Sequence, residues 1–406
     1  MRDKMRLYSA CGTICLLICL KSSLVTCAVT AQDMRAHLST ILPANYTTYI
    51  RPILNQNDPV KVTMDLHLIG INSFDNREQK LTTTAYLNVE WTDQVIADSW
   101  IDTDINHVYV PQGNVWRPDL ALQNGFDTMV GLGSSFLYVR VDRNGLVTWR
   151  PYQVFESGCE VNVRFFPFDK TSCELKFLVW SNTLDKVSVA RGTVGFDTTL
   201  FEANSEWTVL QTSVSEFNAG DNSGILFKIE MERKPLHYLV TILVPVILLG
   251  ALNAFLFVLP ADSGEKTGYA VTAFLSFAVF LTIVGDEIPE NSDKASMFSL
   301  YIFIMTMVST LLVGVTIFQL RIHHRTDDHV PSRFLTRFTR LVRKVRCACC
   351  VGRNPKGREG PEVEEITWES ITEAIDFAGF FFVMLFMLIF TMAIVVASTV
   401  GTQVPN

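Results

Sequence analysis

The stretch "CEVNVRFFPFDKTSC" (159–173) places a cysteine at each end of a short loop and gathers three phenylalanines around a proline at 165–168. Large aromatic side chains stabilise a protein chiefly when they are buried, so a loop that only faces water has no use for three of them. The segment is therefore predicted to be a rigid loop that presses an apolar tip against another part of the molecule.

The N-terminus has the pattern of a secretory signal peptide, assigned to residues 1–28. Basic residues precede a short apolar run at 14–20, and small residues near Ala28 and Ala31 suit cleavage. A short membrane anchor is the alternative, but the run is shorter than the ~20 residues that a span needs. The pattern thus predicts export through an oxidising compartment.

The cysteines predict one disulfide bond. Of the nine in the chain, four lie in the predicted signal peptide and three cluster at 347–350, which leaves Cys159 and Cys173 in the exported N-terminal half. Two such cysteines in an oxidising compartment are expected to pair. Asn45 begins the glycosylation sequon Asn-Tyr-Thr, which fits the same compartment.

Composition narrows the classes of function. The chain is 49% hydrophobic, above the usual composition of soluble proteins, and the excess is concentrated rather than spread out. The net charge of -7 argues weakly against nucleic acid as a partner. No zinc-ligand spacing, Gly-rich phosphate loop or nucleophile elbow occurs, so the sequence predicts no metal, no cofactor and no enzyme.

Short segments of alternating polarity dominate residues 29–235. Four of them are expected to contain strands: 61–71, 81–91, 134–151 and 173–181. Asn144-Gly145 lies between two alternating runs, which is a strong hairpin signal. Many short strands at this spacing predict a β-sandwich, and 31–42 is the one helical piece.

Four apolar stretches follow Arg233, and each is long enough to cross a ~30 Å hydrocarbon core. They are 236–259, 267–285, 295–320 and 377–400. The basic loop 321–358 is cytoplasmic by the positive-inside rule, and the connection after the second stretch is acidic, as suits the outer side. Both ends of the mature chain are therefore expected outside the cell.

The cytoplasmic loop contains a predicted amphipathic helix. Its apolar residues recur at helical spacing, with arginines on the other face: Phe334, Leu335, Phe338, Leu341, Val342 and Val345. Such a helix can lie on the inner leaflet, and a solvated helix is the alternative. The cysteines at 347–350 follow it directly, and two alternatives remain for them: palmitoylation or simple reduced thiols.

The second apolar stretch carries one stripe at spacings of three or four residues. Its members are Glu265, Gly268, Thr272, Leu275, Val279, Ile283 and Asp286. The rise from the first carboxylate to the last is ~32 Å, which matches a membrane. Several copies around an axis would form carboxylate rings that concentrate cations and an apolar ring that blocks ions when narrow. Ordinary helix packing is the alternative, but packing does not need carboxylates at both ends.

Together these residues resemble the Cys-loop, pentameric ligand-gated ion channels, and in particular nicotinic acetylcholine receptor subunits of an invertebrate type. The likeness lies in the Cys-x13-Cys loop with Phe-Pro-Phe-Asp, "WRPDL" (116–120), "EWTVL" (206–210), "LHYLVTILVPVILLG" (236–250) and "LPADSGEKTGYAVTAFLSFAVFLTIVGDEIP" (259–289). It covers the chain from about residue 31 to 400.

The resemblance implies an extracellular, all-β, immunoglobulin-like sandwich with an N-terminal helix, a four-helix transmembrane bundle, and a pentamer of identical or homologous subunits. The expected parts are a signal peptide (1–28), a ligand-binding sandwich (29–235), three membrane helices (236–321), a cytoplasmic loop (322–373), and a fourth helix with an extracellular C-terminus (374–406). The expected location is the plasma membrane, with a postsynaptic membrane as one option.

Roles in gating are also implied. The second helix lines the pore in this family, and Gly-Glu-Lys at 264–266 is similar to its cation-selective branch, although Gly268 stands where Ser or Thr is usual. The disulfide-closed loop would touch the membrane domain. The residues expected to couple binding to gating are Phe166, Pro167, Phe168, Asp169, Arg233 and Pro289, with Asp169 as a candidate partner of Arg233.

The ligand pocket of the family is an aromatic cage for a cationic amine between two subunits. Trp180 matches its central tryptophan, whereas Gln123 replaces a usual tyrosine and Tyr86 a usual tryptophan. Thr148 and Arg150 would lie on the complementary side. The capping loop 213–224 offers Phe217 but lacks the adjacent cysteine pair, so acetylcholine is expected to bind poorly.

The sequence thus predicts a subunit of a cation-selective channel opened by a small extracellular ligand, with membrane lipid and permeant cations as further partners. One rival is an accessory subunit that binds no ligand without partner subunits. Another is a non-conducting surface receptor of the same fold, which would have no reason to carry the stripe from Glu265 to Asp286.

Overall fold

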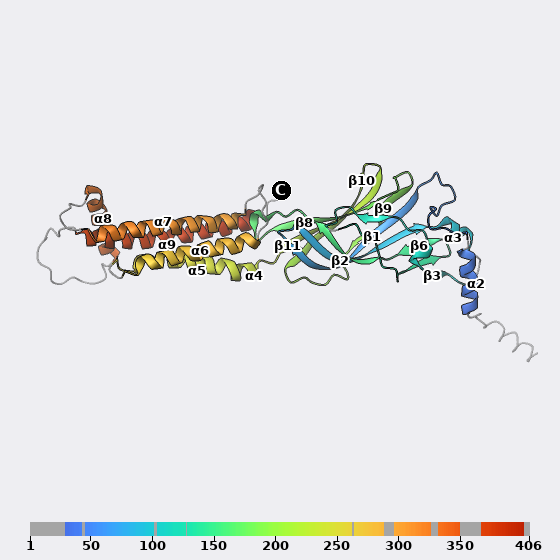
Figure 1. Ribbon diagram of the computed structural model, residues 1–406, viewed down its shortest axis with the longest axis horizontal. Helices are drawn as coiled ribbons and strands as arrows, with labels where there is room; N and C mark the ends of the chain where they lie inside the picture. The colour runs from blue at the N-terminus through green and yellow to red at the C-terminus, as the bar shows by residue number, and fades with distance from the viewer. Residues whose placement is uncertain are drawn as a thin grey trace, which may run out of the picture.

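The computed structural model describes residues 29–42, 45–100, 104–126, 128–261, 264–287, 296–325, 332–349 and 367–401. The molecule is elongated, with strands in one half and long helices in the other (Figure 1). The predicted signal peptide (1–28) and Pro289 lie outside the described residues.

The predicted β-sandwich is confirmed. One sheet has the strand order β3-β5-β6-β2-β1-β9, with β7 also paired to β2, and the other has the order β10-β11-β8-β4. The strands are β1 (Val60–Asp75), β2 (Lys80–Thr92), β3 (His107–Pro111), β4 (Leu120–Leu122), β5 (Tyr138–Asp142), β6 (Leu146–Trp149), β7 (Tyr152–Gly158), β8 (Lys170–Val179), β9 (Val187–Asp197), β10 (Trp207–Ala219) and β11 (Asn222–Arg233).

The core lies between the two sheets and follows from the alternation in the sequence. The four apolar residues that alternate along the start of β1 are all buried: Val62, Met64, Leu66 and Leu68. Phe155 of the first sheet meets Phe177 of the second edge-on at 5.3 Å between ring centroids, and Phe227 continues this contact. Aromatic rings therefore join the two sheets.

The predicted hairpin at Asn144-Gly145 joins β5 to β6. Gly145 has φ of +75°, and a Cβ at this position would collide with the backbone carbonyl of Asp93. Both the positive φ and the lack of space require glycine here.

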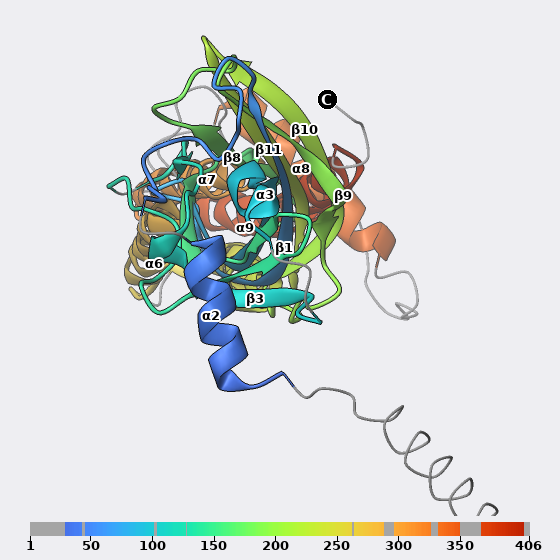
Figure 2. The same ribbon diagram turned by 90° about the vertical axis from the view of Figure 1, so that its right-hand side faces the viewer.

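The helical piece predicted at 31–42 is α2 (Ala31–Ile41), which lies at the end of the sandwich away from the long helices (Figure 1) and points toward the viewer in Figure 2. Thr30 and Asp33 form a capping box at its start. Its buried residues His37 and Ile41 hold it in place, near the short helix α3 (Gln94–Asp98). Asn45, in the predicted sequon, is exposed just beyond α2.

In the described part of the chain, four helices are long and apolar enough to cross a membrane. The first, Leu236–Val258, is made of α4 (Leu236–Tyr238), the π-helical η3 (Leu239–Leu243), α5 (Val244–Phe255) and η4 (Leu256–Val258). The others are α6 (Lys266–Glu287), α7 (Met297–His323) and α9 (Trp368–Gly401). The helix α8 (Arg333–Cys349), predicted as amphipathic, packs against α9.

The fourth helix begins at Trp368, whereas the apolar stretch predicted in the sequence begins only at residue 377. Its first turns are polar on one side, but Trp368 and Ile371 are buried next to Ile322 and Leu335. Hydropathy identifies only the apolar part of a helix, so it does not detect the polar turns before residue 377 that pack on neighbouring helices.

The helices form a bundle in which α6 and α9 each pack against α5 and α7. The helices α6 and α9 therefore lie diagonally across the bundle, and Lys266 at the start of α6 reaches Asp376 of α9. If one of them faces an assembly axis, the other faces lipid.

Candidate functional site

The loop closed by Cys159 and Cys173 contacts the helical half of the molecule. Cys159 and Cys173 are joined by a disulfide bond with Cα atoms 5.1 Å apart. Phe166, at the tip, is fully buried, and its ring centroid lies 4.9 Å from that of Tyr238 and 6.2 Å from that of Phe298. An aromatic cluster thus joins the sandwich to two membrane helices, while the role of the loop in gating stays a prediction.

Arg233 and Asp169, both predicted coupling residues, form a buried ion pair. Arg233 donates from Nε to Asp169 Oδ1 at 2.8 Å and from Nη2 to Oδ2 at 3.1 Å, and the two side chains are 1% and 0% exposed. Arg233 Nη2 also donates to Asn76. Its guanidinium lies 4.2 Å from the ring centroid of Trp207 and 5.3 Å from that of Phe166. The charge of Arg233 and its planar guanidinium therefore both contribute, since the group makes two bonds to Asp169 and lies against two aromatic rings.

Of the other predicted coupling residues, Pro167 is buried and Phe168 is partly buried. Sequence reasoning missed Phe165, which lies in the 3₁₀ turn η2 (Val163–Phe165) and contacts the end of α9. A Cβ at Gly401 would collide with its ring. The loop thus touches the fourth helix as well as the third.

Breaking the disulfide with Cys159→Ser and Cys173→Ser should cost about 3 kcal/mol, because a loop of this size gains that much from closure in the chain-entropy model. Surface labelling of cells should show much less of the double variant than of the wild type. The matched control replaces Cys347 and Cys349 with serine. Equal surface levels for both double variants would contradict the expectation.

All seven residues of the predicted stripe are exposed, from Glu265, directly before α6, to Asp286 near its end. The opposite side of the helix holds Ala270, Phe277 and Val284, which are buried against the bundle. The stripe thus faces away from the rest of its own chain. Leu275, Val279 and Ile283 form an exposed apolar row within it, which a single chain leaves uncovered.

A buried charge lies beside the Glu265 end of the stripe. Lys266, the neighbour of Glu265, is 0% exposed, and its Nζ lies 2.5 Å from Asp376 Oδ1 on α9. Its Nζ also lies 6.0 Å from the ring centroid of Phe257. Sequence reasoning missed Asp376, although an acid within a membrane-length helix is itself a signal of function or pairing.

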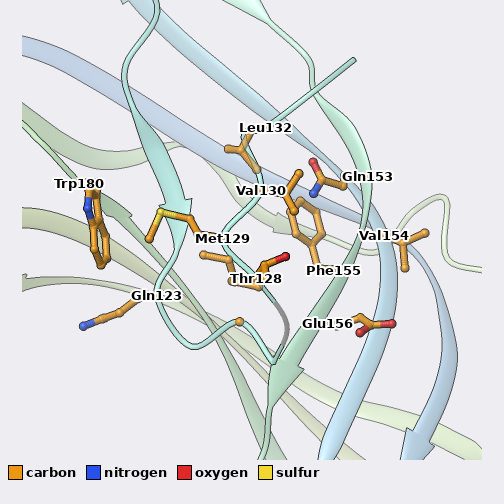
Figure 3. Close-up of a pocket in the computed structure, with 12 residues that line it drawn as sticks. Gln123, Thr128, Met129, Val130, Leu132, Gln153, Val154, Phe155, Glu156 and Trp180 are labelled. Atoms are coloured by element: carbon orange, nitrogen blue, oxygen red, sulfur yellow. The ribbon is translucent and has the colours of Figure 1, made fainter. Parts of the chain in front are cut away.

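Two of the predicted ligand residues, Trp180 and Gln123, line one pocket of about 330 Å³ in the sandwich (Figure 3). The pocket is also lined by Met129, Val130 and Glu156. Trp180 is 53% exposed, so it is not a core residue. Its indole is thus available to a ligand or to a neighbouring subunit.

Tyr86 lies on the first sheet, where its ring stacks on His67 with centroids 4.4 Å apart. His67 Nδ1 is 2.8 Å from Asp197 Oδ2. Hydrogen bonds from Thr199, and then the contact with His67, lower the pKa of the Asp197 carboxyl below its ordinary value. An ionised Asp197 therefore holds His67 in place behind Tyr86.

Thr148 and Arg150 lie on the same face of that sheet as Tyr86. Arg150 donates from Nε to Asn88 Oδ1 at 3.0 Å, and Thr148 Oγ1 lies 3.5 Å from Glu90 Oε1. These contacts add polar and charged groups to the surface around Tyr86, next to the rings of His67 and Tyr152.

Phe217 lies on β10 opposite Gly224 of β11, and its ring covers the space that a Cβ of Gly224 would take. Phe217, Tyr86, Thr148 and Arg150 all lie in described parts of the chain, and none of them lines the pocket of Trp180. Within one chain the predicted ligand residues therefore do not line a single pocket.

A sandwich whose disulfide loop packs on α7, α9 and the start of the first membrane-length helix defines a membrane receptor with an extracellular domain. The model of the neurotransmitter-gated ion-channel ligand binding domain matches residues 35–235, and that of the transmembrane region of the same channels matches residues 242–362. The chain belongs to the neurotransmitter-gated ion channel family and is a subunit of the nicotinic receptor type. The resemblance seen in the sequence is thus confirmed.

Among its curated relatives is the human neuronal acetylcholine receptor subunit beta-3, with 30% identity over 79% of this chain and 71% of the relative. The human neuronal subunit alpha-6 is 30% identical over 82% of this chain and 69% of the relative. Acetylcholine receptor subunit alpha-like 2 of Drosophila melanogaster is 29% identical over 83% of this chain and 62% of the relative. The family consists of ligand-gated channels rather than enzymes.

Proposed function

We propose that the chain forms a cation-selective channel in the plasma membrane, with α6 lining a pore at the centre of a pentamer. The observation that carries this proposal is the exposed stripe of α6, which has a carboxylate at each end, Glu265 and Asp286, and faces away from its own bundle. Rings of carboxylates raise the local concentration of cations and repel anions.

The apolar row of the stripe supplies the gate. Leu275, Val279 and Ile283 are exposed on one chain but would face one another across a pentamer axis. A narrow ring of such side chains excludes water and therefore ions, and a small widening readmits both.

The ligand is a small cationic amine bound where neighbouring subunits meet, with Trp180 on one side and Tyr86 on the other. The support is the exposure of Trp180 in a pocket and the separation of Tyr86, Thr148 and Arg150 onto a face of the other sheet. Each cation–π contact at an exposed site contributes ~0.5–1 kcal/mol. Since Gln123 supplies no ring, acetylcholine should bind this chain more weakly than a complete cage.

An accessory role is the second candidate, and the surroundings of Tyr86 favour it. Tyr86 is stacked on His67, and its neighbours on the sheet include the charged Glu90 and Arg150. Such a surface would form a poor second half of an acetylcholine site on a partner subunit. In this role the chain would contribute to the pore and to assembly, but not to ligand binding.

Leu275→Ser tests the pore directly, since a hydroxyl in the apolar ring should hydrate the gate and let ions pass without ligand. The variant, expressed alone in oocytes, should show a resting current whose reversal potential moves negative when sodium is replaced by a large impermeant cation. Wild type and Leu388→Ser, a change at an exposed leucine of α9, should show none.

Two outcomes would count against the proposal. A reversal potential that follows chloride would exclude cation selectivity. Surface protein without current would show that this chain alone forms no pore, and coexpression with a related subunit would then separate the accessory role from a non-conducting receptor.

A further inference from the structure

The segment expected to cap the ligand, 213–224, is a closed hairpin rather than a loop. Its ladder between β10 and β11 has no register shift and continues to the pair of Ala219 and Asn222. Only Gly220 and Asp221 remain for the turn, and Gly220 has φ of +60°, as suits glycine at the first position of a two-residue turn. Backbone pairing therefore fixes this segment up to its last two residues.

The side chain of Asn222, beside the turn, holds the segment that follows β8. Its Nδ2 lies 2.8 Å from the carbonyl oxygen of Val179, 3.0 Å from that of Trp180 and 3.3 Å from that of Asn182. Only the donor end of an amide suits three carbonyl oxygens. The N–H of Trp180 donates to the Asp119 carbonyl at 3.0 Å, so the backbone of Trp180 is held at both its N–H and its carbonyl.

Further contacts hold the hairpin on its other sides. Three hydrogen bonds of 2.7–2.9 Å tie it to the residues between 184 and 191: the Leu184 N–H to the Asp221 carbonyl, the Val189 N–H to Ser223 Oγ, and the Arg191 N–H to Glu216 Oε1. The ring of Phe217 lies across its cross-strand partner Gly224, an arrangement that stiffens a strand at a glycine. A hinge motion of the hairpin would have to break these bonds together.

We propose that the β10–β11 hairpin is a fixed wall of the ligand site rather than a movable cap, and that Asn222 is the residue that positions Trp180 in it. The inference rests on the proposed function, in which Trp180 is the aromatic contact for the ligand. A segment that closes over a ligand has to leave its contacts easily, and such segments have few protected hydrogen bonds. This hairpin instead shares its hydrogen bonds with the backbone of Trp180 itself.

The consequence is that a ligand enters and leaves the site without waiting for a conformational step. Binding to a preformed site requires less ordering than binding that closes a lid. The same arrangement gives up the contacts that a closing lid would add. Asn222 acts only through Trp180, because its amide nitrogen is turned toward the three carbonyl oxygens.

Hydrogen exchange of the purified full-length chain tests the fixed hairpin without any ligand. The amides that pair β10 with β11 at 213–224 should exchange about as slowly as those that pair β11 with β8, since both ladders belong to one sheet. Asn222→Asp keeps the shape of the side chain but removes its donors, and it should speed exchange in the hairpin on the order of tenfold. The matched control, Asn218→Asp, adds the same charge at an exposed residue of the same hairpin and should change exchange by less than about twofold.

A spectroscopic signature of Trp180 separates positioning from a general effect on stability. The chain is labelled with fluorotryptophan, and the fluorine resonance of Trp180 is assigned by its loss in Trp180→Phe. Asn222→Asp should shift this resonance, because the Trp180 carbonyl loses a donor, whereas Asn218→Asp should leave it in place. Melting temperatures close to that of the wild type confirm that the variants fold, and the exchange of the wild type needs no variant.

Tetramethylammonium, as a small cationic probe, tests the ligand contact separately. A shift of the Trp180 resonance on its addition is expected from contact with the indole, and the hairpin should then exchange at the same rate as in the free chain. An unchanged resonance would count against the proposed ligand contact, while the fixed hairpin would still be decided by the exchange of the free chain.

The proposal fails on any of three observations. Hairpin amides that exchange on the order of tenfold faster than the ladder of β11 and β8 in the wild type would identify a mobile cap. Slower exchange of the hairpin once the probe has shifted the Trp180 resonance would show that the hairpin closes over it. The same Trp180 resonance in Asn222→Asp and in the wild type would remove the positioning role of Asn222.

Discussion

Replacing Arg233 with glutamine is expected to destabilise the protein by about 3–5 kcal/mol, because it leaves the Asp169 carboxylate buried without its counter-charge. Both side chains are almost fully buried, so water cannot replace the lost partner. The change also removes the guanidinium from the face of Trp207. We expect little Arg233→Gln protein at the cell surface and a markedly lower melting temperature for the purified chain.

Matched variants separate the local pair from general effects of charge. Arg77→Gln removes the same charge from an exposed position in the turn between β1 and β2 and should behave as the wild type. Arg233→Lys keeps the charge but cannot make both bonds to Asp169, so it should be intermediate. Surface levels and melting temperature of Arg233→Gln equal to those of Arg77→Gln would refute the importance of the pair.

Replacing Asp376 with asparagine is expected to lower the unitary cation conductance several-fold. The variant leaves the charge of Lys266 uncompensated one residue from Glu265, at the mouth of the proposed pore. At an effective dielectric constant of ~20, a unit charge ~10 Å away changes the energy of a cation by ~1.7 kcal/mol. The carboxylate of Asp376 thus neutralises Lys266, so that the negative charge of Glu265 is not offset at this mouth.

The measurement is single-channel recording in the Leu275→Ser background, because it counts only channels that reach the surface. Glu373→Gln is the control, since Glu373 lies one turn earlier on α9 and pairs at the surface with Arg346. The exchange of Lys266→Asp with Asp376→Lys should restore part of the conductance. A normal conductance in Asp376→Asn, with cation current intact in the background variant, would leave the pair a purely structural role.

Much of the fold could be predicted because it depends on neighbours along the chain. The alternation at 61–71 and the hairpin at Asn144-Gly145 predict strands, since both arise from backbone geometry within a few residues. The length of apolar runs predicts four membrane helices. The stripe from Glu265 to Asp286 also follows from helical periodicity, and its members indeed share an exposed face.

The tertiary structure alone decided which distant residues meet. Lys266 pairs with Asp376, 110 positions away, and Arg233 pairs with Asp169, 64 positions away, a partner that the family resemblance suggests but no local pattern predicts. No period in the sequence links such pairs, because their contact depends on how whole sheets and helices pack. The ligand residues show the same limit: Trp180 and Gln123 share a pocket, but Tyr86 and Phe217 lie elsewhere. The sequence by itself determined the elements and their faces, whereas packing decided what each face touches.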